Sequence, residues 1–362
     1  MQKTEDHAMR CNYRFRFVSL AVLFFLFPMI IPAAGEKSAA PSYNRFKEAA
    51  SGSYFYRVKL PPGYVLESAQ RLQFRSEGVV IDLYSRGFAQ GDAVYMEMYA
   101  DEKIDKKLKV KKVIVDGQEI PVSSRSWGYR GLFAINPDSV PGEREIACSV
   151  SLGWSGRELS ARFPVVKKEF PFKKKPLDLG KFSNVEYQQN PEIIEFIKEC
   201  SLKKNEAFSR KSEDMLSERV SHPRDLHFIT SPFWSKRRYL RYKIRGRKRV
   251  YLQSRTKVHA GLDLRGEEGS PLFVMADGEV ALADKLFYEG NMLIIDHGNG
   301  IFTYYMHLQD HKVKKGDRVK AGDLVATVGS TGLSTASHLH VSCIIRGIQV
   351  DPLSLLSLPV RD

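Results

Sequence analysis

The stretch His338-Leu-His-Val-Ser-Cys-Ile-Ile345 has the two-residue period of a half-buried β-strand. The positions predicted to face a core are Leu339, Val341, Cys343 and Ile345. Alternate side chains of a strand point to opposite faces, so His338 and His340 share the other face. The stretch therefore predicts a strand that presents two imidazoles on one side of a sheet.

The surrounding sequence continues this pattern of short strands separated by glycine turns. Residues 271–276 precede Asp277-Gly278, residues 292–296 precede Gly298-Asn-Gly300, and residues 301–306 follow at once. Such spacing leaves little room for helices. We therefore predict a compact antiparallel β domain over residues 226–358.

Two further segments of this region carry residue types that bind zinc. They are His259-Ala-Gly-Leu-Asp263 and Tyr304-Tyr-Met-His307-Leu308. Imidazole and carboxylate groups are zinc ligands, and three protein ligands leave a fourth position for water, whose pKa the metal lowers towards neutral. On a straight strand His259 and Asp263 would lie about 13–14 Å apart, too far to share one ion. The backbone must bend between them, and Gly261 is the residue expected to permit the bend.

A single histidine is more often a hydrogen-bonded core or turn residue than a ligand. We assign His297, within Asp296-His-Gly-Asn-Gly300, to that structural role, together with His227 and His311. The combination of His-x-x-x-Asp, an isolated His-Leu and a later His-x-His is far more specific than any one histidine.

Residues 228–352 resemble the lysostaphin-type (LytM-like) zinc peptidases of peptidoglycan. The matching segments are Ser231-Pro-Phe, Val258-His-Ala-Gly-Leu-Asp-Leu, Ala276-Asp-Gly-Glu-Val, Ile294-Ile-Asp-His-Gly-Asn-Gly, Tyr305-Met-His-Leu, Val313-Lys-Lys-Gly-Asp, Val328-Gly-Ser-Thr-Gly-Leu-Ser-Thr, His338-Leu-His and Val350-Asp-Pro. The segments occur in the family's order and cover about a third of the chain.

The resemblance implies one Zn²⁺ per catalytic domain, with His259, Asp263 and His340 as ligands; the spacing by itself does not decide between His338 and His340. It implies that His307 and His338 stand unliganded beside the metal water, as a general base or as an oxyanion-stabilising pair. The implied activity is hydrolysis of peptide cross-links of bacterial peptidoglycan, and which cross-link is cut stays open. The alternative is a catalytically inactive relative that binds the wall or activates other wall hydrolases.

Several positions depart from the family pattern. Trp234 and Met306 stand where glycine is common, Ala336-Ser337 replaces Gly-Pro, and Ser342 occupies a frequent glutamate position. Residues 240–256 are longer and more basic than usual. None of these departures removes a predicted ligand.

The N-terminal half reads as a separate β module. Short apolar runs over residues 53–166 alternate with turn signals, and Asp116-Gly117 predicts a two-residue hairpin. We predict a β-sandwich over residues 36–166, which loosely resembles the immunoglobulin-like domain that precedes this peptidase in some exported proteins. Residues 167–225 are predicted to be a connector with a helix from residue 192 to about 220, and Pro191 suits its first turn. The fold class is therefore mainly β.

The segment Lys236–Arg249 contains nine basic residues, and no acidic residue lies between Asp225 and Asp263. Two interpretations stay open: a solvated loop, or a rim that attracts acidic glycan–peptide strands or anionic envelope polymers. Nucleic acid as a partner is disfavoured by the predicted export.

The N-terminus has the order of a secretory signal. Arg10, Arg14 and Arg16 precede the uncharged residues 17–31, and the small residues Ala33-Ala34-Gly35 follow. We expect residues 1–35 to be a signal peptide, cleaved in preference to being retained as an anchor, and the protein to reach the periplasm or cell envelope. The net charge of +14 suits an anionic wall or membrane surface. The three cysteines beyond this leader are predicted to be buried free thiols, namely Cys148, Cys200 and Cys343.

Overall fold

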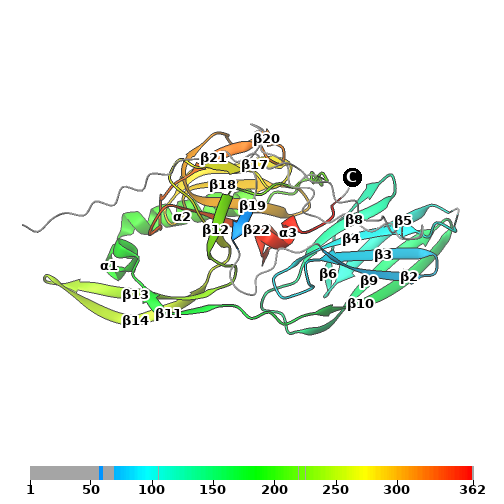
Figure 1. Ribbon diagram of the computed structural model, residues 1–362, viewed down its shortest axis with the longest axis horizontal. Coiled ribbons are helices and arrows are strands. Elements are labelled where there is room, and N and C mark those ends of the chain that lie inside the picture. Colours follow the sequence, from blue (N-terminus) through cyan, green and yellow to red (C-terminus); the bar gives the residue numbers. More distant parts are fainter. Residues whose placement is uncertain (1–56, 60–68, 105, 219, 225, 361–362) are drawn as a thin grey trace, which may run out of the picture. The chain divides into compact units, whose positions relative to one another are not determined.

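The computed structural model describes residues 57–59, 69–104, 106–218, 220–224 and 226–360. The predicted leader, residues 1–35, lies outside the described residues. Within the described ranges, no helix combines the length and the apolar character needed to cross a membrane. Most elements are strands, which confirms the predicted fold class (Figure 1).

The N-terminal module consists of two antiparallel sheets that share one core. One sheet has the order β2-β3-β4-β8-β7 and the other β10-β9-β5-β6. The strands are β2 (Gln70–Ser76), β3 (Val79–Ser85), β4 (Ala93–Ala100), β5 (Leu108–Val115), β6 (Gln118–Glu119), β7 (Val122–Arg125), β8 (Gly128–Ala134), β9 (Gly142–Leu152) and β10 (Ser155–Val165). Side chains from both sheets meet in one buried cluster that includes Leu83, Met96, Phe133, Ile146 and Phe163. This is the expected sandwich; its immunoglobulin-like character stays a prediction.

The hairpin predicted at Asp116-Gly117 is present. Val115 pairs with Gln118, so the loop between β5 and β6 has two residues. Both loop residues have positive φ, 48° for Asp116 and 76° for Gly117. That geometry is the turn that matches the twist of the flanking strands.

The connector holds a shorter helix than predicted. α2 spans Pro191–Phe208, begins with Asn190 as its N-cap, and follows the 3-10 turn Gly180–Ser183 and α1 (Val185–Gln188). The expectation that the helix reaches residue 220 is wrong. Residues 210–218 form no helix, and their backbone bonds to the C-terminal domain: Met215 N–H donates to His297 O, and Asn299 N–H donates to Ser212 O.

The C-terminal domain is built on a mostly antiparallel sheet with the order β1-β12-β15-β22-β19-β18-β17-β20. β1 is the exception and pairs in parallel with β12. The strands of this domain are β1 (Arg57–Lys59), β12 (Leu226–Ser231), β15 (Leu262–Arg265), β16 (Pro271–Phe273), β17 (Gly278–Leu286), β18 (Gly290–Asp296), β19 (Ile301–His311), β20 (Arg318–Val319), β21 (Leu324–Val328), β22 (His338–Ile345) and β23 (Ile348–Val350), followed by α3 (Pro352–Leu356). The predicted compact antiparallel β domain is confirmed.

The basic segment is a β-hairpin and not a loop. β13 (Lys236–Arg245) pairs with β14 (Lys248–Val258) in antiparallel register. β11 (Phe172–Leu177) of the connector adds in parallel to β13, a strand that the sequence reading did not anticipate. Figure 1 shows β13 and β14 as a long ribbon with β11 beside it. β14 ends at Val258, directly before His259, so the hairpin leads into the predicted ligands.

Candidate metal centre

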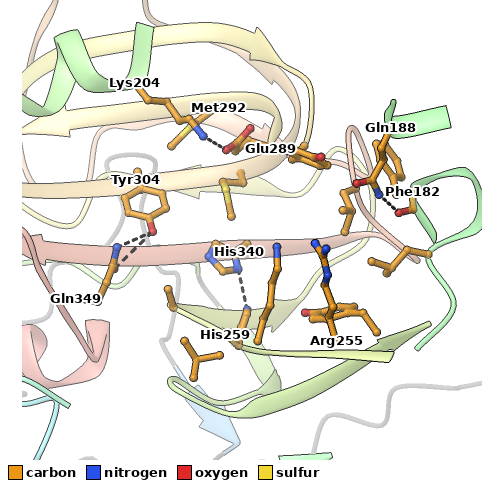
Figure 2. Close-up of a pocket in the computed structure, with 18 of the residues that line it drawn as sticks. Phe182, Gln188, Lys204, Arg255, His259, Glu289, Met292, Tyr304, His340 and Gln349 are labelled. Atoms are coloured by element: carbon orange, nitrogen blue, oxygen red, sulfur yellow. Dashed lines mark hydrogen bonds and ion pairs between the residues drawn. The ribbon is translucent and has the colours of Figure 1, made fainter. Parts of the chain in front are cut away.

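Three residues predicted to bind zinc meet at one point. His259 lies between β14 and β15, Asp263 on β15 and His340 on β22, and Asp263 pairs with His340 across the two strands. His259 Nε2, Asp263 Oδ1 and His340 Nδ1 are each 2.9 Å from the other two. All three side chains are buried. Figure 2 shows the imidazoles of His259 and His340 turned toward each other.

The hydrogen bonds around the two imidazoles determine which nitrogen bears a proton. His259 Nδ1 lies 3.3 Å from Pro232 O, and a carbonyl oxygen can only accept, so Nδ1 carries the proton. His340 Nε2 lies 2.9 Å from Ser342 Oγ, whose own hydroxyl donates to Ala260 O at 3.2 Å. His340 Nε2 is therefore the donor. In both rings the nitrogen without a proton is the one that faces the cluster.

Three electron-pair donors thus face one another with no proton to share. Two imidazole nitrogens and a carboxylate oxygen at 2.9 Å would repel one another unless a cation lay among them. The set of two nitrogens and one oxygen is a zinc donor set, and three protein ligands leave a coordination position for water or substrate. The residues present therefore fit a metal ion.

Burial and neighbouring groups set the protonation of these ligands. Arg237 Nη2 donates to Asp263 Oδ2 at 2.7 Å, and this guanidinium favours the ionised carboxylate. Burial lowers the pKa of His340 to about 3, so its ring is neutral at pH 7. A neutral imidazole and an ionised carboxylate are the forms that bind metal.

His307 and His338 stand beside the three candidate ligands. Their ring centroids are 4.9 Å apart, and His338 Nε2 lies 3.7 Å from Asp263 Oδ1. His307 Nδ1–H donates to Thr331 O at 2.9 Å, and His338 Nδ1–H donates to Ala336 O at 2.7 Å. Both rings therefore keep Nε2 as an acceptor. Burial, reinforced by His338, lowers the pKa of His307 to about 4.

A β-bulge aims His307 at the site. Asn291 of β18 pairs with Leu308 and Leu293 pairs with Tyr305, so β19 contains one extra residue between these pairs. His307 lies in that bulge with φ 63°, a left-handed conformation that is uncommon for residues other than glycine. Regular alternation would place His307 on the same face as the buried Tyr305. The bulge redirects it.

Gly261 permits close approach and needs no unusual φ. A Cβ at Gly261 would lie 2.5 Å from both His340 Nε2 and Val341 O, and would also clash with Ser342 Oγ. The bend between the two ligands is present as predicted. The glycine is required because β22 passes directly against it, and this reason differs from the conformational freedom that we expected.

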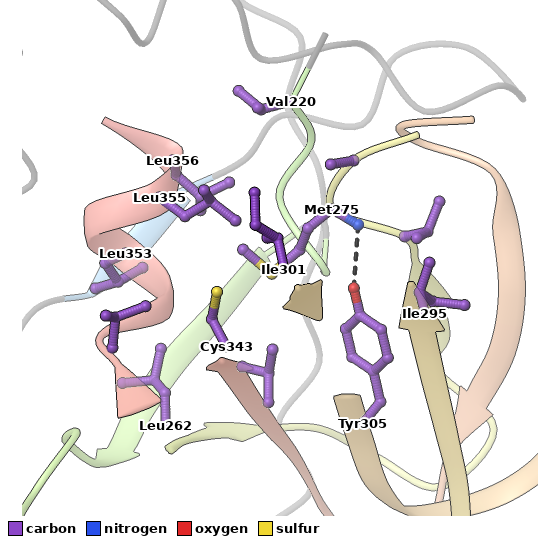
Figure 3. Close-up of a cluster of buried hydrophobic side chains, with 14 of the residues drawn as sticks. Val220, Leu262, Met275, Ile295, Ile301, Tyr305, Cys343, Leu353, Leu355 and Leu356 are labelled. Atoms are coloured by element: carbon purple, nitrogen blue, oxygen red, sulfur yellow. Dashed lines mark hydrogen bonds between the residues drawn. The ribbon is translucent and has the colours of Figure 1, made fainter. Parts of the chain in front are cut away.

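The sheet beneath the ligands is packed into the main core. Leu339, Val341, Cys343 and Ile345 of β22 are fully buried, as their alternation predicts. Figure 3 shows Cys343 and Leu262 packed with Leu353 and Leu355 of α3, while Met275 N–H donates to the Tyr305 hydroxyl at 3.1 Å. Such packing holds the ligand-bearing strands in fixed register.

His297 follows the structural assignment made from the sequence. His297 is fully buried, with Nδ1 2.8 Å from Asp277 O and Nε2 2.8 Å from Thr303 Oγ1. His311 lies at the end of β19, and the side chain of His227 is outside the described part. The predicted free thiols Cys148, Cys200 and Cys343 are confirmed as buried and unpaired.

Four residues support the site in ways that the sequence did not predict. Arg237 of β13 donates from Nη2 to Asp263 Oδ2 at 2.7 Å. Thr331 binds His307 through its carbonyl and Leu308 O through its hydroxyl, and Ser342 holds His340. Trp234, at a common glycine position, has φ 57°, and its backbone N–H donates to His259 O at 2.8 Å. Arg237 joins the site through a separate sheet, and no local sequence signal indicates it.

The two imidazoles and one carboxylate form a candidate metal site on the C-terminal β domain. Residues 257–352 match the sequence model of peptidase family M23. Peptidoglycan DD-endopeptidase ShyC of Vibrio cholerae serotype O1 is 38% identical over 96 residues, which are 26% of this chain and 22% of that protein. DD-carboxypeptidase/endopeptidase Mpg of Neisseria meningitidis serogroup B is 36% identical over 106 residues, which are 29% of this chain and 24% of that protein.

Among solved structures, a crystal structure of a putative peptidase M23 from Pseudomonas aeruginosa is 21% identical with a TM-score of 0.49. The match covers 74% of this chain and 95% of that one. The present chain spans less than a quarter of the length of each of the two curated relatives described above.

Proposed function

We propose that this protein is an exported zinc endopeptidase that hydrolyses peptide cross-links of bacterial peptidoglycan. The observation that carries the proposal is the convergence of three proton-free donor atoms from His259, Asp263 and His340. Relatives of the M23 domain are named peptidoglycan DD-endopeptidases, which supports the substrate class. Export is supported by the order of charged, apolar and small residues over 1–35.

The residues assign separate tasks to the two histidine groups. Zinc held by His259, Asp263 and His340 would polarise the scissile carbonyl and lower the pKa of water. His307 and His338 supply two Nε2 atoms that can take the proton of the attacking water, because each Nδ1 proton is held by a backbone carbonyl. Once protonated, the pair can donate to the developing oxyanion or to the leaving amine.

Mass spectrometry of fragments released from defined peptidoglycan tests the proposal. We expect the protein to open cross-links, giving uncross-linked stem peptides with new amino and carboxyl ends. His340→Ala should abolish this release. Equal release by His340→Ala would refute metal-dependent hydrolysis, and wild-type protein that releases nothing while stimulating another hydrolase would favour the inactive-relative alternative. Binding of anionic envelope polymers through residues 236–249 stays a prediction.

A further inference from the structure

A pocket opens directly beside the metal-binding residues. Its volume is about 650 Å³, and its wall includes His259 and His340. The basic hairpin β13–β14 forms one side, and residues of β18, β19, β22 and the connector form the others. In Figure 2 the Arg255 side chain rises from the hairpin into this pocket.

The lining of the pocket is strongly positive. It contains four cationic side chains, Lys204, Arg241, Arg255 and Lys257, and one carboxylate, Glu289. Glu289 forms an ion pair with Lys204, which neutralises both. Within the described ranges, no carboxylate pairs with Arg241, Arg255 or Lys257. Three uncompensated cations therefore face one cavity.

The register of the hairpin explains why these cations gather. Arg237 pairs with Lys257 and Tyr239 pairs with Arg255, and residues directly opposite each other in antiparallel strands lie on one face. Arg237 on that face reaches Asp263, so the face is turned toward the metal-binding residues. Arg238, which pairs with Thr256, lies on the opposite face.

We propose that Arg241, Arg255 and Lys257 form a subsite that binds a free carboxylate of the peptide substrate close to the scissile bond. The proposal rests on the proposed function, because it places the subsite beside the groups that would cut the peptide. Guanidinium groups bind carboxylates through paired charge-assisted hydrogen bonds. Wall stem peptides carry such carboxylates on their acidic residues, and amidation converts them into neutral groups that cannot form this ion pair.

A matched pair of substrates tests the subsite. One is a cross-linked stem-peptide dimer with free side carboxylates, and the other is the same dimer with those carboxylates amidated. Wild-type protein should prefer the acidic dimer in kcat/KM by about tenfold, the factor expected from one charge-assisted hydrogen bond. The double variant Arg255→Gln/Lys257→Gln should lose that preference, mainly through KM, since the carboxylate is not the reacting group.

Arg238→Gln is the matched control, because it removes one positive charge from the other face of the same hairpin. It should retain the wild-type preference. The proposal is overturned if wild-type protein shows no preference, if the double variant keeps it, or if Arg238→Gln loses it equally.

Failure of the proposed function would give a different result, namely no hydrolysis of either dimer. In that case the affinities of the acidic and the amidated dimer are measured by calorimetry. The proteins compared are wild type, Arg238→Gln and the double variant. Tighter binding of the acidic dimer that is lost only in the double variant supports the subsite. Equal binding of both dimers overturns it.

Discussion

Arg237 Nη2 lies 2.7 Å from Asp263 Oδ2, and the other carboxylate oxygen of Asp263 faces His259 and His340. The guanidinium therefore holds one oxygen and leaves Oδ1 as the atom that would bind the proposed metal ion. The side chains are largely buried, 15% exposed for Arg237 and 9% for Asp263, so solvent screens the pair only weakly.

Replacing Arg237 should weaken metal binding without removing a ligand. Loss of a group that orients a ligand typically lowers metal affinity about 10–100-fold. We expect Arg237→Gln to fall in that range when zinc affinity is measured by competition with a chelator. Arg238→Gln, with the same charge change on the other face, should bind zinc as tightly as wild type. Equal affinities of all three proteins would show that Arg237 does not position Asp263.

Gly261→Ala should disrupt the candidate metal centre, because the added methyl group would press against β22. The new Cβ would press on Val341 O, a backbone atom that cannot rotate away, and on His340 Nε2. We expect a loss of stability of about 1–3 kcal/mol, as for overpacking, together with reduced zinc content. Gly156→Ala is the control, because nothing lies within 4 Å of its Cβ position. A Gly261→Ala protein with normal denaturation midpoint and zinc content would contradict the described approach of β22.

Alanine variants of His307 and His340 should differ in zinc content. His307 is not among the proposed ligands, so His307→Ala should keep its zinc and lose roughly 10²–10⁴-fold in kcat, the usual contribution of general acid–base catalysis. His340→Ala should lose zinc as well as activity. Metal analysis and peptide release measured on the same samples separate the two effects. Zinc loss in His307→Ala would assign that residue to the ligand set instead.

His297 should make stability depend on pH. Burial lowers its pKa below 6.5, so the unfolded chain binds the proton more readily than the folded chain. The contribution of neutral His297 to the free energy of unfolding is therefore fully present above about pH 6.5. It is lost as the pH falls below that value, at up to about 1.4 kcal/mol per pH unit. The free energy of unfolding should be measured by urea denaturation at several pH values between 7.5 and 5. It should change less with pH for His297→Asn than for wild type. An equal change of the free energy of unfolding with pH in both proteins would show that protonation of His297 does not affect stability.

Alternation of apolar residues and turn sequences correctly predicted individual strands and a hairpin. The alternation of residues 338–345 predicted the strand and its two faces, and Asp116-Gly117 predicted its hairpin. The residues that form the cluster came from a family resemblance, since spacing alone did not choose between His338 and His340. In the structure His340 Nδ1 lies 2.9 Å from Asp263 Oδ1, and His338 Nε2 lies 3.7 Å from the same atom, which favours His340 as the proposed ligand.

Features that depend on distant contacts were missed. The charged residues within 209–218 led us to predict a surface helix. Their backbone instead forms hydrogen bonds with the turn around His297. The pairing of β11 with β13, the bulge at His307 and the ion pair of Arg237 with Asp263 all join segments separated in sequence. Local periodicity carries no information about such partners.

Zinc reconstitution of the metal-free protein tests the central claim most directly. After removal of metal with a chelator, peptide release from purified peptidoglycan should stop. Titration with Zn²⁺ should then restore it, reaching a plateau at about one equivalent of metal per chain, as expected for one set of three ligands. Release that persists without metal, or that zinc fails to restore, would contradict the account.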